Sequence, residues 1–126
     1  SVLFSKFIKN SSNKDKIFTK SNIEKAIIYI SENLHKKLTV EDLAAYCNLN
    51  KDHFSRSFCQ NFGMRPIKYI QSRRVQRAQL LLLTTVDPLK DVAEKVGIEN
   101  MSYFIRTFKK FTGKTPNDFK KEQLKI

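Results

Sequence analysis

Apolar residues recur along most of this chain every three or four positions, the spacing that places side chains on one face of an α-helix. A first helix is predicted to begin at Ser21, because Ser21 and Glu24 form a capping box, which satisfies free amides at a helix start. Its apolar face consists of Ile23, Ile27, Ile30 and Leu34. No convincing stretch shows the strict alternation of a strand, so the fold is predicted to be all-α.

Capping residues and helix breakers divide the rest of the chain into six further predicted helices. Their starts are marked by Thr39 with Asp42, by Lys51, by Pro66, by Asp87 with Pro88 as first helical residue, by Met101, and by Thr115 with Pro116. The third helix should end near Gly63 and the sixth near Gly113, while the long fourth helix should end before the 84–87 loop. The apolar face of that fourth helix is predicted to include Ile67, Ile70, Val75, Ala78 and Leu82.

The second half of the chain repeats the first half. At an offset of fifty residues, Phe54, Arg56, Phe58, Gly63, Pro66 and Tyr69 recur as Phe104, Arg106, Phe108, Gly113, Pro116 and Phe119. At an offset of forty-nine, Leu43, Ala44 and Leu49 correspond to Val92, Ala93 and Ile98. Each repeat is a short helix, a tight turn and a helix with phenylalanines, which is the layout of a helix-turn-helix. We therefore expect two such units, at about 21–65 and 87–121, joined by a long helix at about 66–84.

The chain of 126 residues is strongly basic, with 24 Lys and Arg against 12 Asp and Glu and a formal charge of +12. This excess is not confined to a tail, and it predicts attraction to a polyanion, with solubility alone as the alternative. A duplicated reading element favours duplex DNA, whose grooves repeat at a fixed pitch. A membrane surface would require a helix with a wide exposed apolar face, which is not found. No apolar run approaches the ~20 residues that span a bilayer.

Helical geometry separates a buried face from an outward face in the two phenylalanine-bearing helices. Phe54 and Phe58 lie about 40° apart on the helix, so they are assigned to the core. The outward faces carry Asp52, Arg56 and Gln60 in one helix, and Ser102, Arg106 and Lys110 in the other. Each unit thus presents one arginine at the same outward position, where its planar fork can donate to guanine O6 and N7 in the major groove. A surface arginine that meets only phosphate or water is the alternative reading.

Further candidates lie beside these outward faces and along the long helix. Met101 and Ile105 either pack on thymine methyl groups or complete the core. No acidic residue occurs between Gly63 and Val86, and the basic residues there either hold phosphates or form a solvated face. The candidates for phosphate contact are Lys51, Gln60, Arg65, Lys68, Arg73, Arg74, Arg77, Asn100, Lys109, Lys110 and Lys114.

The second unit resembles the DNA-binding domain of the AraC/XylS family of bacterial transcription regulators. The resemblance is carried by Asp91-Val92-Ala93, Val96-Gly97-Ile98, Ser102-Tyr103-Phe104, Arg106, Phe108-Lys109-Lys110 and Gly113-Lys114-Thr115-Pro116. The first unit is similar through Leu43-Ala44, Phe54, Arg56, Phe58, Gly63, Pro66 and Tyr69-Ile70. The resemblance implies seven helices, with two recognition helices in successive major grooves. It also implies base-contacting positions at Asp52, Ser55, Arg56, Met101, Ser102, Ile105 and Arg106.

We therefore expect a sequence-specific transcription regulator, most often an activator in such a family, that binds double-stranded DNA at the nucleoid in the cytoplasm. RNA polymerase is a further expected partner. Residues 1–20 are expected to be a linker or the end of a removed N-terminal domain, which would supply effector binding or dimerisation. The alternative is a protein-interaction module that recruits polymerase or a partner regulator without reading DNA.

No enzymatic activity, cofactor or metal is expected. A glycine-rich phosphate loop, a nucleophile elbow and a paired-carboxylate site are not recognisable in the sequence. His35 and His53 lack partners at metal-ligand spacing, and alkyl-group transfer would need a cysteine-metal cluster that is absent. Of the two cysteines, Cys47 is predicted to be buried core and Cys59 to be partly exposed.

Overall fold

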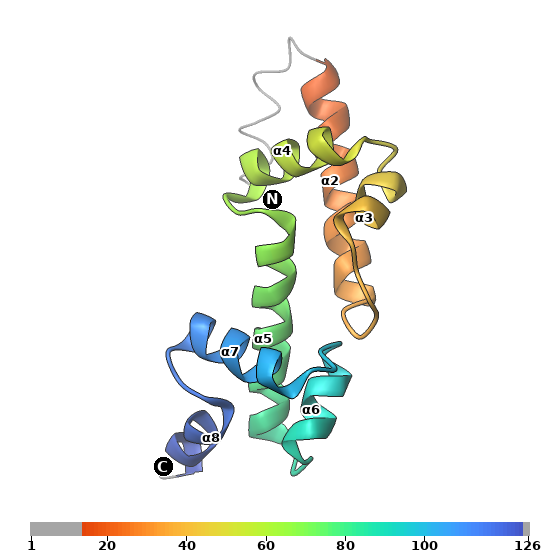
Figure 1. Ribbon diagram of the computed structural model, residues 1–126. Coiled ribbons are helices and arrows are strands. Elements are labelled where there is room, and N and C mark those ends of the chain that lie inside the picture. The colour runs from red at the N-terminus through yellow and green to blue at the C-terminus, as the bar shows by residue number, and fades with distance from the viewer. Residues whose placement is uncertain (1–13, 125–126) are drawn as a thin grey trace. The chain divides into compact units, whose positions relative to one another are not determined.

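The computed structural model describes residues 14–124, with side chains for residues 22–123. Over this range the chain forms seven helices and no strand (Figure 1). They are α2 (Lys14–Glu32), α3 (Val40–Tyr46), α4 (Lys51–Phe62), α5 (Pro66–Thr84), α6 (Leu89–Lys95), α7 (Met101–Thr112) and α8 (Pro116–Leu124). The all-α class is confirmed, whereas residues 1–13 of the predicted linker lie outside the described residues.

The described chain divides into two compact units. The first unit contains α2 to residue 32 and the chain from Thr39 to Pro66, which includes α3 and α4. The second unit contains α5 from Ile67 onwards, α6, α7 and α8. It also contains the segment Asn33–Leu38, although this segment lies between α2 and α3 in the sequence.

The first unit is held together by α4, which packs on both α2 and α3. The phenylalanines predicted to be core, Phe54 and Phe58, are fully buried with 0% exposure. The other buried apolar residues of this unit include Ile23, Ala26, Ile30, Leu43, Ala44 and Cys47. The Cys47 thiol also donates a hydrogen bond to the Asn22 carbonyl at 3.0 Å, and burial raises the pKa of that thiol. Cys47 is therefore a core residue, as predicted, whereas Cys59 is exposed.

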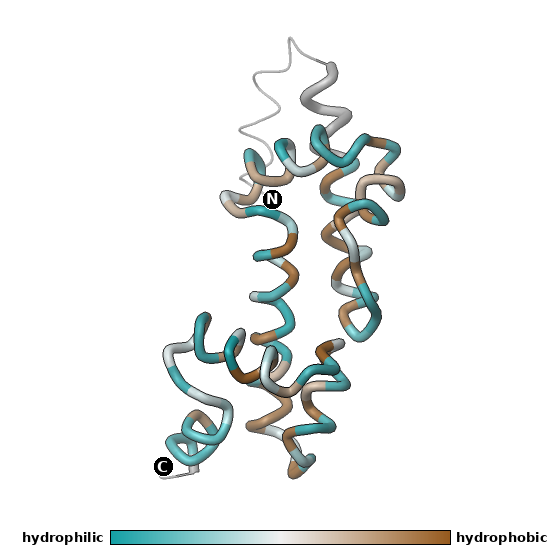
Figure 2. Tube along the Cα trace, viewed as in Figure 1, coloured by the Kyte–Doolittle hydropathy of each residue, from teal (hydrophilic) through white to brown (hydrophobic). Residues whose placement is uncertain are grey.

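The core of the second unit joins α5, α6 and α7, and α7 also packs on α8. Figure 2 shows apolar positions recurring along α5, α6 and α7 of this unit. The buried residues are Val75, Ala78, Leu82, Val92, Ala93, Val96, Ile98, Phe104 and Phe108. Phe119 of α8 packs against them and meets Phe108 edge to face, with ring centroids 5.6 Å apart. The predicted core positions of Phe104, Phe108 and Phe119 are confirmed.

The two copies of the sequence repeat form the same backbone hydrogen bond at their turns. In the first turn the Leu49 amide donates to the Ala44 carbonyl at 2.9 Å, and in the second the Ile98 amide donates to the Ala93 carbonyl at 2.9 Å. Each turn contains one residue in the left-handed region, Asn48 with φ 58° and Gly97 with φ 85°. A side chain at position 97 would place its Cβ 2.2 Å from the Leu34 carbonyl oxygen, so glycine is required there.

Three details of the sequence prediction are wrong. The first helix begins at Lys14 rather than Ser21, because residues 14–20 contain neither glycine nor proline and the helix continues through them. Asp87 does not cap α6, since Pro88 occupies the N-cap position and the Asp87 carboxylate accepts a hydrogen bond from Lys95 at 2.5 Å. Ile67 is 45% exposed, so the predicted apolar face of α5 is buried only from one turn later, at Ile70 with 3% exposure.

Candidate nucleic-acid interface

In the first unit, α4 exposes one face between well-defined ends. The Asn50 side chain accepts a hydrogen bond from the His53 amide at 2.8 Å, which starts the helix. Gly63 ends it with φ 72°. Between these ends the helix buries Phe54, Ser57 and Phe58. On the opposite side Asp52 and Arg56 are exposed and Ser55 is half-buried, so the predicted base-contacting residues share an accessible face.

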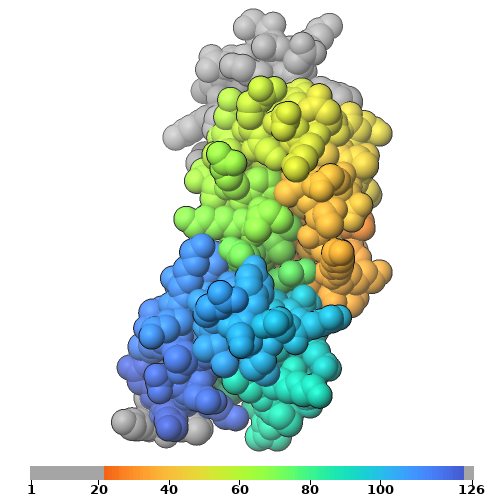
Figure 3. All heavy atoms as spheres, viewed as in Figure 1, coloured from red at the N-terminus to blue at the C-terminus, as the bar shows by residue number. Residues whose placement is uncertain are grey.

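In the second unit, α7 has the same frame with different side chains. Asn100 accepts a hydrogen bond from the Tyr103 amide at 2.8 Å, and Gly113 ends the helix with φ 80°. The helix buries Phe104, Thr107 and Phe108. Ser102 and Arg106 are exposed, and the Arg106 Nε lies 3.4 Å from the Ser102 carbonyl oxygen. In the space-filling view of Figure 3, α7 lies at the visible surface of the second unit.

The two apolar candidates of α7 have both an inward and an outward part. Met101 and Ile105 pack against the buried cluster of the second unit, yet each is only half-buried. Each of these two side chains can therefore pack in the core and still contact a ligand with its exposed part. The buried part fixes the rotation of α7, and the exposed part is an apolar surface beside Arg106.

The basic candidates differ in how far other groups already bind them. Those exposed, with no partner recorded among the described residues, are Arg65, Lys68, Arg77 and Lys109. Lys110 is exposed too, and its Nζ lies 5.7 Å from the centroid of the Phe111 ring. Lys51 lies 3.8 Å from Glu41, Lys114 forms an ion pair with Glu122, and Arg73 donates to Gln76 at 2.7 Å. Gln60 is exposed, and Asn100 is the N-cap of α7.

Arg74 is bound within the second unit. Its Nε donates to the Leu34 carbonyl at 3.2 Å, and its Nη2 donates to the Lys36 carbonyl at 2.7 Å. Burial lowers the pKa of the guanidinium, and interaction with Tyr103 opposes this shift. A Cβ at Gly97 would lie 3.1 Å from Nη2, so the guanidinium also stands beside the turn that precedes α7. Arg74 therefore holds the segment Asn33–Leu38 next to that turn.

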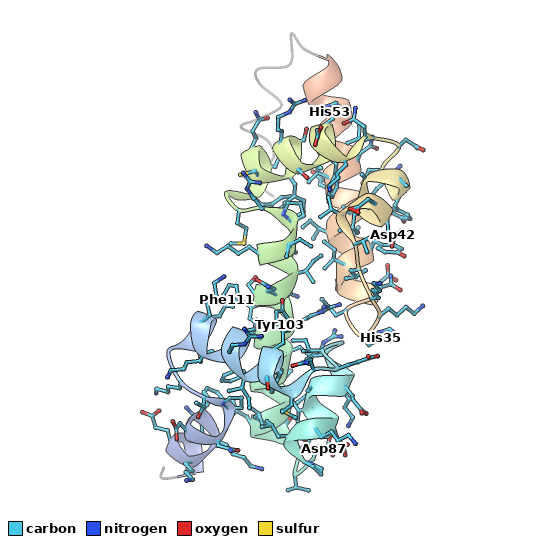
Figure 4. All side chains as sticks on the ribbon, viewed as in Figure 1. His35, Asp42, His53, Asp87, Tyr103 and Phe111 are labelled. Atoms are coloured by element: carbon cyan, nitrogen blue, oxygen red, sulfur yellow. The ribbon has the colours of Figure 1, made fainter. Side chains whose placement is uncertain are left out.

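Sequence reasoning missed a second contact that orients α7. The Gln71 amide on α5 donates to the Tyr103 hydroxyl at 2.5 Å, and Figure 4 shows Tyr103 on α7 beside α5. It also missed the capping roles of Asn50 and Asn100. A signal was present for the caps, since asparagine directly precedes both phenylalanine-bearing helices. The Gln71–Tyr103 contact leaves no pattern in the sequence.

Comparison with known proteins identifies the family to which this chain belongs. A family model described as a helix-turn-helix domain matches residues 43–122. The C-terminal domain of AraT, a response regulator from Geobacillus stearothermophilus, superposes with a TM-score of 0.78 at 31% identity. That match covers 80% of this chain and 84% of the AraT chain. The chain belongs to the AraC-type helix-turn-helix family.

Other AraC-type proteins give the same picture. The DNA-binding domain of AdpA, a global transcriptional factor solved in complex with a target DNA, has a TM-score of 0.77 at 26% identity, covering 79% of this chain and 90% of that one. The bifunctional transcriptional activator/DNA repair enzyme AdaA of Bacillus subtilis is 42% identical over 92 residues, which are 73% of this chain and 44% of AdaA. This chain thus spans less than half the length of that relative. The family and fold are those of DNA-binding transcription regulators.

Two negative findings concern the described part of the chain. Residues 14–124 contain no helix that is long and apolar enough to cross a membrane. Within the same range, no group of three or more His, Cys, Asp or Glu side chains could hold a metal ion.

Proposed function

We propose that this chain is the DNA-reading part of a transcription regulator, in which α4 and α7 each enter a major groove of duplex DNA. The observation that carries the proposal is the pair Arg56 and Arg106. Both are exposed on the face opposite the buried phenylalanines, at positions that correspond in the two repeats. Successive grooves on one side of B-form DNA lie about 34 Å apart, so the proposal requires the two helices to reach that spacing.

The exposed side chains differ in which bases they suit. Arginine pairs with guanine O6 and N7, which assigns one guanine to each of Arg56 and Arg106. Asp52 on α4 would accept from the N4 amino group of cytosine. The exposed parts of Met101 and Ile105 on α7 would contact thymine methyl groups. The proposal therefore assigns G and C to the half-site under α4, and G next to T to the half-site under α7.

The residues that hold phosphates would surround these base contacts. Exposure supports Arg65, Lys68, Arg77, Lys109 and Lys110 in this role, with Gln60 as a neutral donor. Lys51, Arg73 and Lys114 already have an intramolecular partner with which a phosphate would compete. Asn100 would donate to a phosphate through its Nδ2 while its Oδ1 keeps the cap on the Tyr103 amide. Arg74 was also a candidate from the sequence, but its guanidinium is bound to two backbone carbonyls, and we assign it no phosphate.

The remaining properties concern the intact protein. We propose a regulator without enzymatic activity that works as an activator through contact with RNA polymerase, with an effector or dimerisation domain elsewhere in its chain. The support for a further domain is the length of the relatives, since AdaA extends well beyond the matched part. A cytoplasmic location follows from the same proposal, because the DNA of a bacterium lies in that compartment.

Replacement of Arg106 by Ala tests the base contact. A duplex obtained by binding-site selection and a random duplex would be titrated with the parent and the variant at one salt concentration. We expect a loss of about 1–3 kcal/mol on the selected duplex, with relaxed preference at a single base pair. The random duplex should lose much less.

The control is Lys121→Ala, which removes one exposed charge from α8 of the same unit. It should leave base preference unchanged. An Arg106→Ala variant with equal losses on both duplexes would reduce Arg106 to a phosphate contact. Failure of the parent chain to select any duplex sequence would overturn the proposed function itself.

A further inference from the structure

The positive charge of this chain is concentrated in the second unit. Among the described residues of the first unit, seven Lys and Arg face six Asp and Glu, which leaves a net charge of only +1. Among those of the second unit, fourteen Lys and Arg face six Asp and Glu, which leaves +8. Each unit contains a helix-turn-helix, but the two units differ widely in the charge available for phosphates.

The reading helices themselves show this difference. The last turn of α7 carries Lys109 and Lys110, and α7 contains no acidic residue. The corresponding positions of α4 are Cys59 and Gln60. All four side chains are exposed, so the exchange does not arise from packing. In addition, α4 carries Asp52 in its first turn.

The helices that accompany the reading helices show the same asymmetry. The first turn of α3 holds Glu41 and Asp42, and α3 has no basic residue. Its counterpart α6 is balanced, with two basic and two acidic residues. Lys51 at the start of α4 lies 3.8 Å from Glu41, so part of its charge is already compensated. On α5 the exposed Lys68 and Arg77 both belong to the second unit.

We propose that the second unit supplies most of the sequence-independent hold on DNA, whereas the first unit contributes mainly discrimination between bases. This inference rests on the proposed function. Its physical basis is counterion release, since each neutralised phosphate adds a fixed increment to the salt dependence of binding. A unit with little net charge gains little from that term, and its Arg56 and Asp52 act on base edges instead.

The salt dependence of binding by charge variants of the whole chain tests this division. The slope of log K against log salt would be measured on a selected duplex and on a random duplex. Lys109→Gln with Lys110→Gln should reduce the magnitude of this negative slope by about 1.8 on both duplexes. That value corresponds to the loss of two phosphate contacts at about 0.9 each. The matched double variant of the first unit, Lys51→Gln with Arg65→Gln, should reduce the magnitude by only about half as much, because the charge of Lys51 is already partly compensated by Glu41.

A charge transplant makes the test reciprocal. Cys59→Lys with Gln60→Lys places two lysines on α4 where α7 has them, at exposed positions that the fold tolerates. It should increase the magnitude of the slope by about 1.8 and strengthen binding to both duplexes alike, because added phosphate contacts do not depend on sequence. Thermal melts of each variant would verify that it is folded.

The outcomes separate the two proposals. Equal slope losses from the two double variants, or an unchanged slope after the transplant, would overturn the unequal division while leaving DNA binding intact. Absence of salt-dependent binding by the parent chain on any duplex would overturn the proposed function as well.

Discussion

At the scale of single residues, Arg74 is the most constrained of the cations on α5. Its two hydrogen bonds end on the carbonyls of Leu34 and Lys36, at 3.2 Å and 2.7 Å. These carbonyls lie beyond the last residue of α2, in the segment Asn33–Leu38 that connects α2 to α3. The guanidinium satisfies them and stands beside Gly97. Its role is therefore to position the turn before α7.

Replacement of Arg74 by Ala should destabilise the fold by about 1.5–3 kcal/mol, the range for hydrogen bonds from a charged group. The salt slope of DNA binding should stay unchanged, because no phosphate contact is lost. Arg77→Ala is the matched control, since Arg77 is exposed one turn further along α5. It should change stability by less than about 0.5 kcal/mol. Urea unfolding and salt titration would measure both quantities.

One other result would show that Arg74 does bind a phosphate. That result is a variant as stable as the parent whose salt slope falls by about 0.9. Replacement by Lys sharpens the comparison, because lysine keeps the charge but lacks the planar fork that reaches two carbonyls at once. We expect Arg74→Lys to lose most of the stability that Arg74→Ala loses.

Residues with a periodic or repeated signal could be predicted from the sequence, and the others could not. The inward phenylalanines and the outward Arg56 and Arg106 follow from helical spacing, and the structure has them on those faces. Arg74 looked like its neighbours because its partners are backbone carbonyls, which carry no side-chain signal. The base and phosphate roles themselves stay predictions, because they depend on a bound duplex.

At the scale of an element, α7 depends on its first residues for its orientation. Asn100 caps its start, and the Tyr103 hydroxyl is bound by Gln71 of α5. The other end carries Lys109 and Lys110, whose charges are favourable beside the last carbonyls of the helix. The orientation of the reading face is thus set by these contacts together with the packing of Met101 and Ile105 against the buried cluster.

Replacement of Asn100 by Ala should cost about 0.5–2 kcal/mol of stability, because the Tyr103 amide loses its acceptor. Asn100→Ser should recover most of the loss, since serine is an equally good N-cap. Asn117→Ala, at an exposed position of α8, is the control and should be nearly neutral. Thermal unfolding of the three variants measures the effect. A serine variant as unstable as the alanine variant would show that the cap is not the cause.

Helix boundaries could be predicted wherever a residue physically stops or starts the helix. Gly63, Pro66 and Gly113 mark the ends found in the structure, because they adopt or fix the backbone angles that those ends need. The start of α2 was wrong, since a capping box is only favourable and a helix can run through it. The start of α6 was wrong by one residue because Pro88 took the cap position.

At the scale of the whole molecule, each unit has its own buried cluster around two phenylalanines. Replacement of Phe108 by Ala should cost about 3–5 kcal/mol, because it leaves a cavity at a side chain with 0% exposure. Hydrogen exchange would locate the effect. Amides of α6, α7 and α8 should lose protection, while those of α3 and α4 retain more of theirs. A uniform loss over the described helices would show that the two clusters unfold as one.

The organisation into two units followed from the sequence repeat, but two features of it did not. The segment Asn33–Leu38 belongs to the second unit although it follows α2, because Arg74 binds its carbonyls. The uneven charge is present in the sequence, yet it has meaning only after each residue is assigned to a unit. A total of +12 does not by itself show how the charge divides between the two units.

The two helix-turn-helix turns differ in which residues their left-handed position accepts. Asn48 has a left-handed backbone that a glycine would also accept, whereas position 97 has no room for even one carbon beyond the backbone. Copying the second turn into the first unit is therefore feasible, and copying the first into the second is not. The exchange of turns between the repeats therefore works in one direction only, because the Leu34 carbonyl oxygen leaves no space for a side chain at position 97.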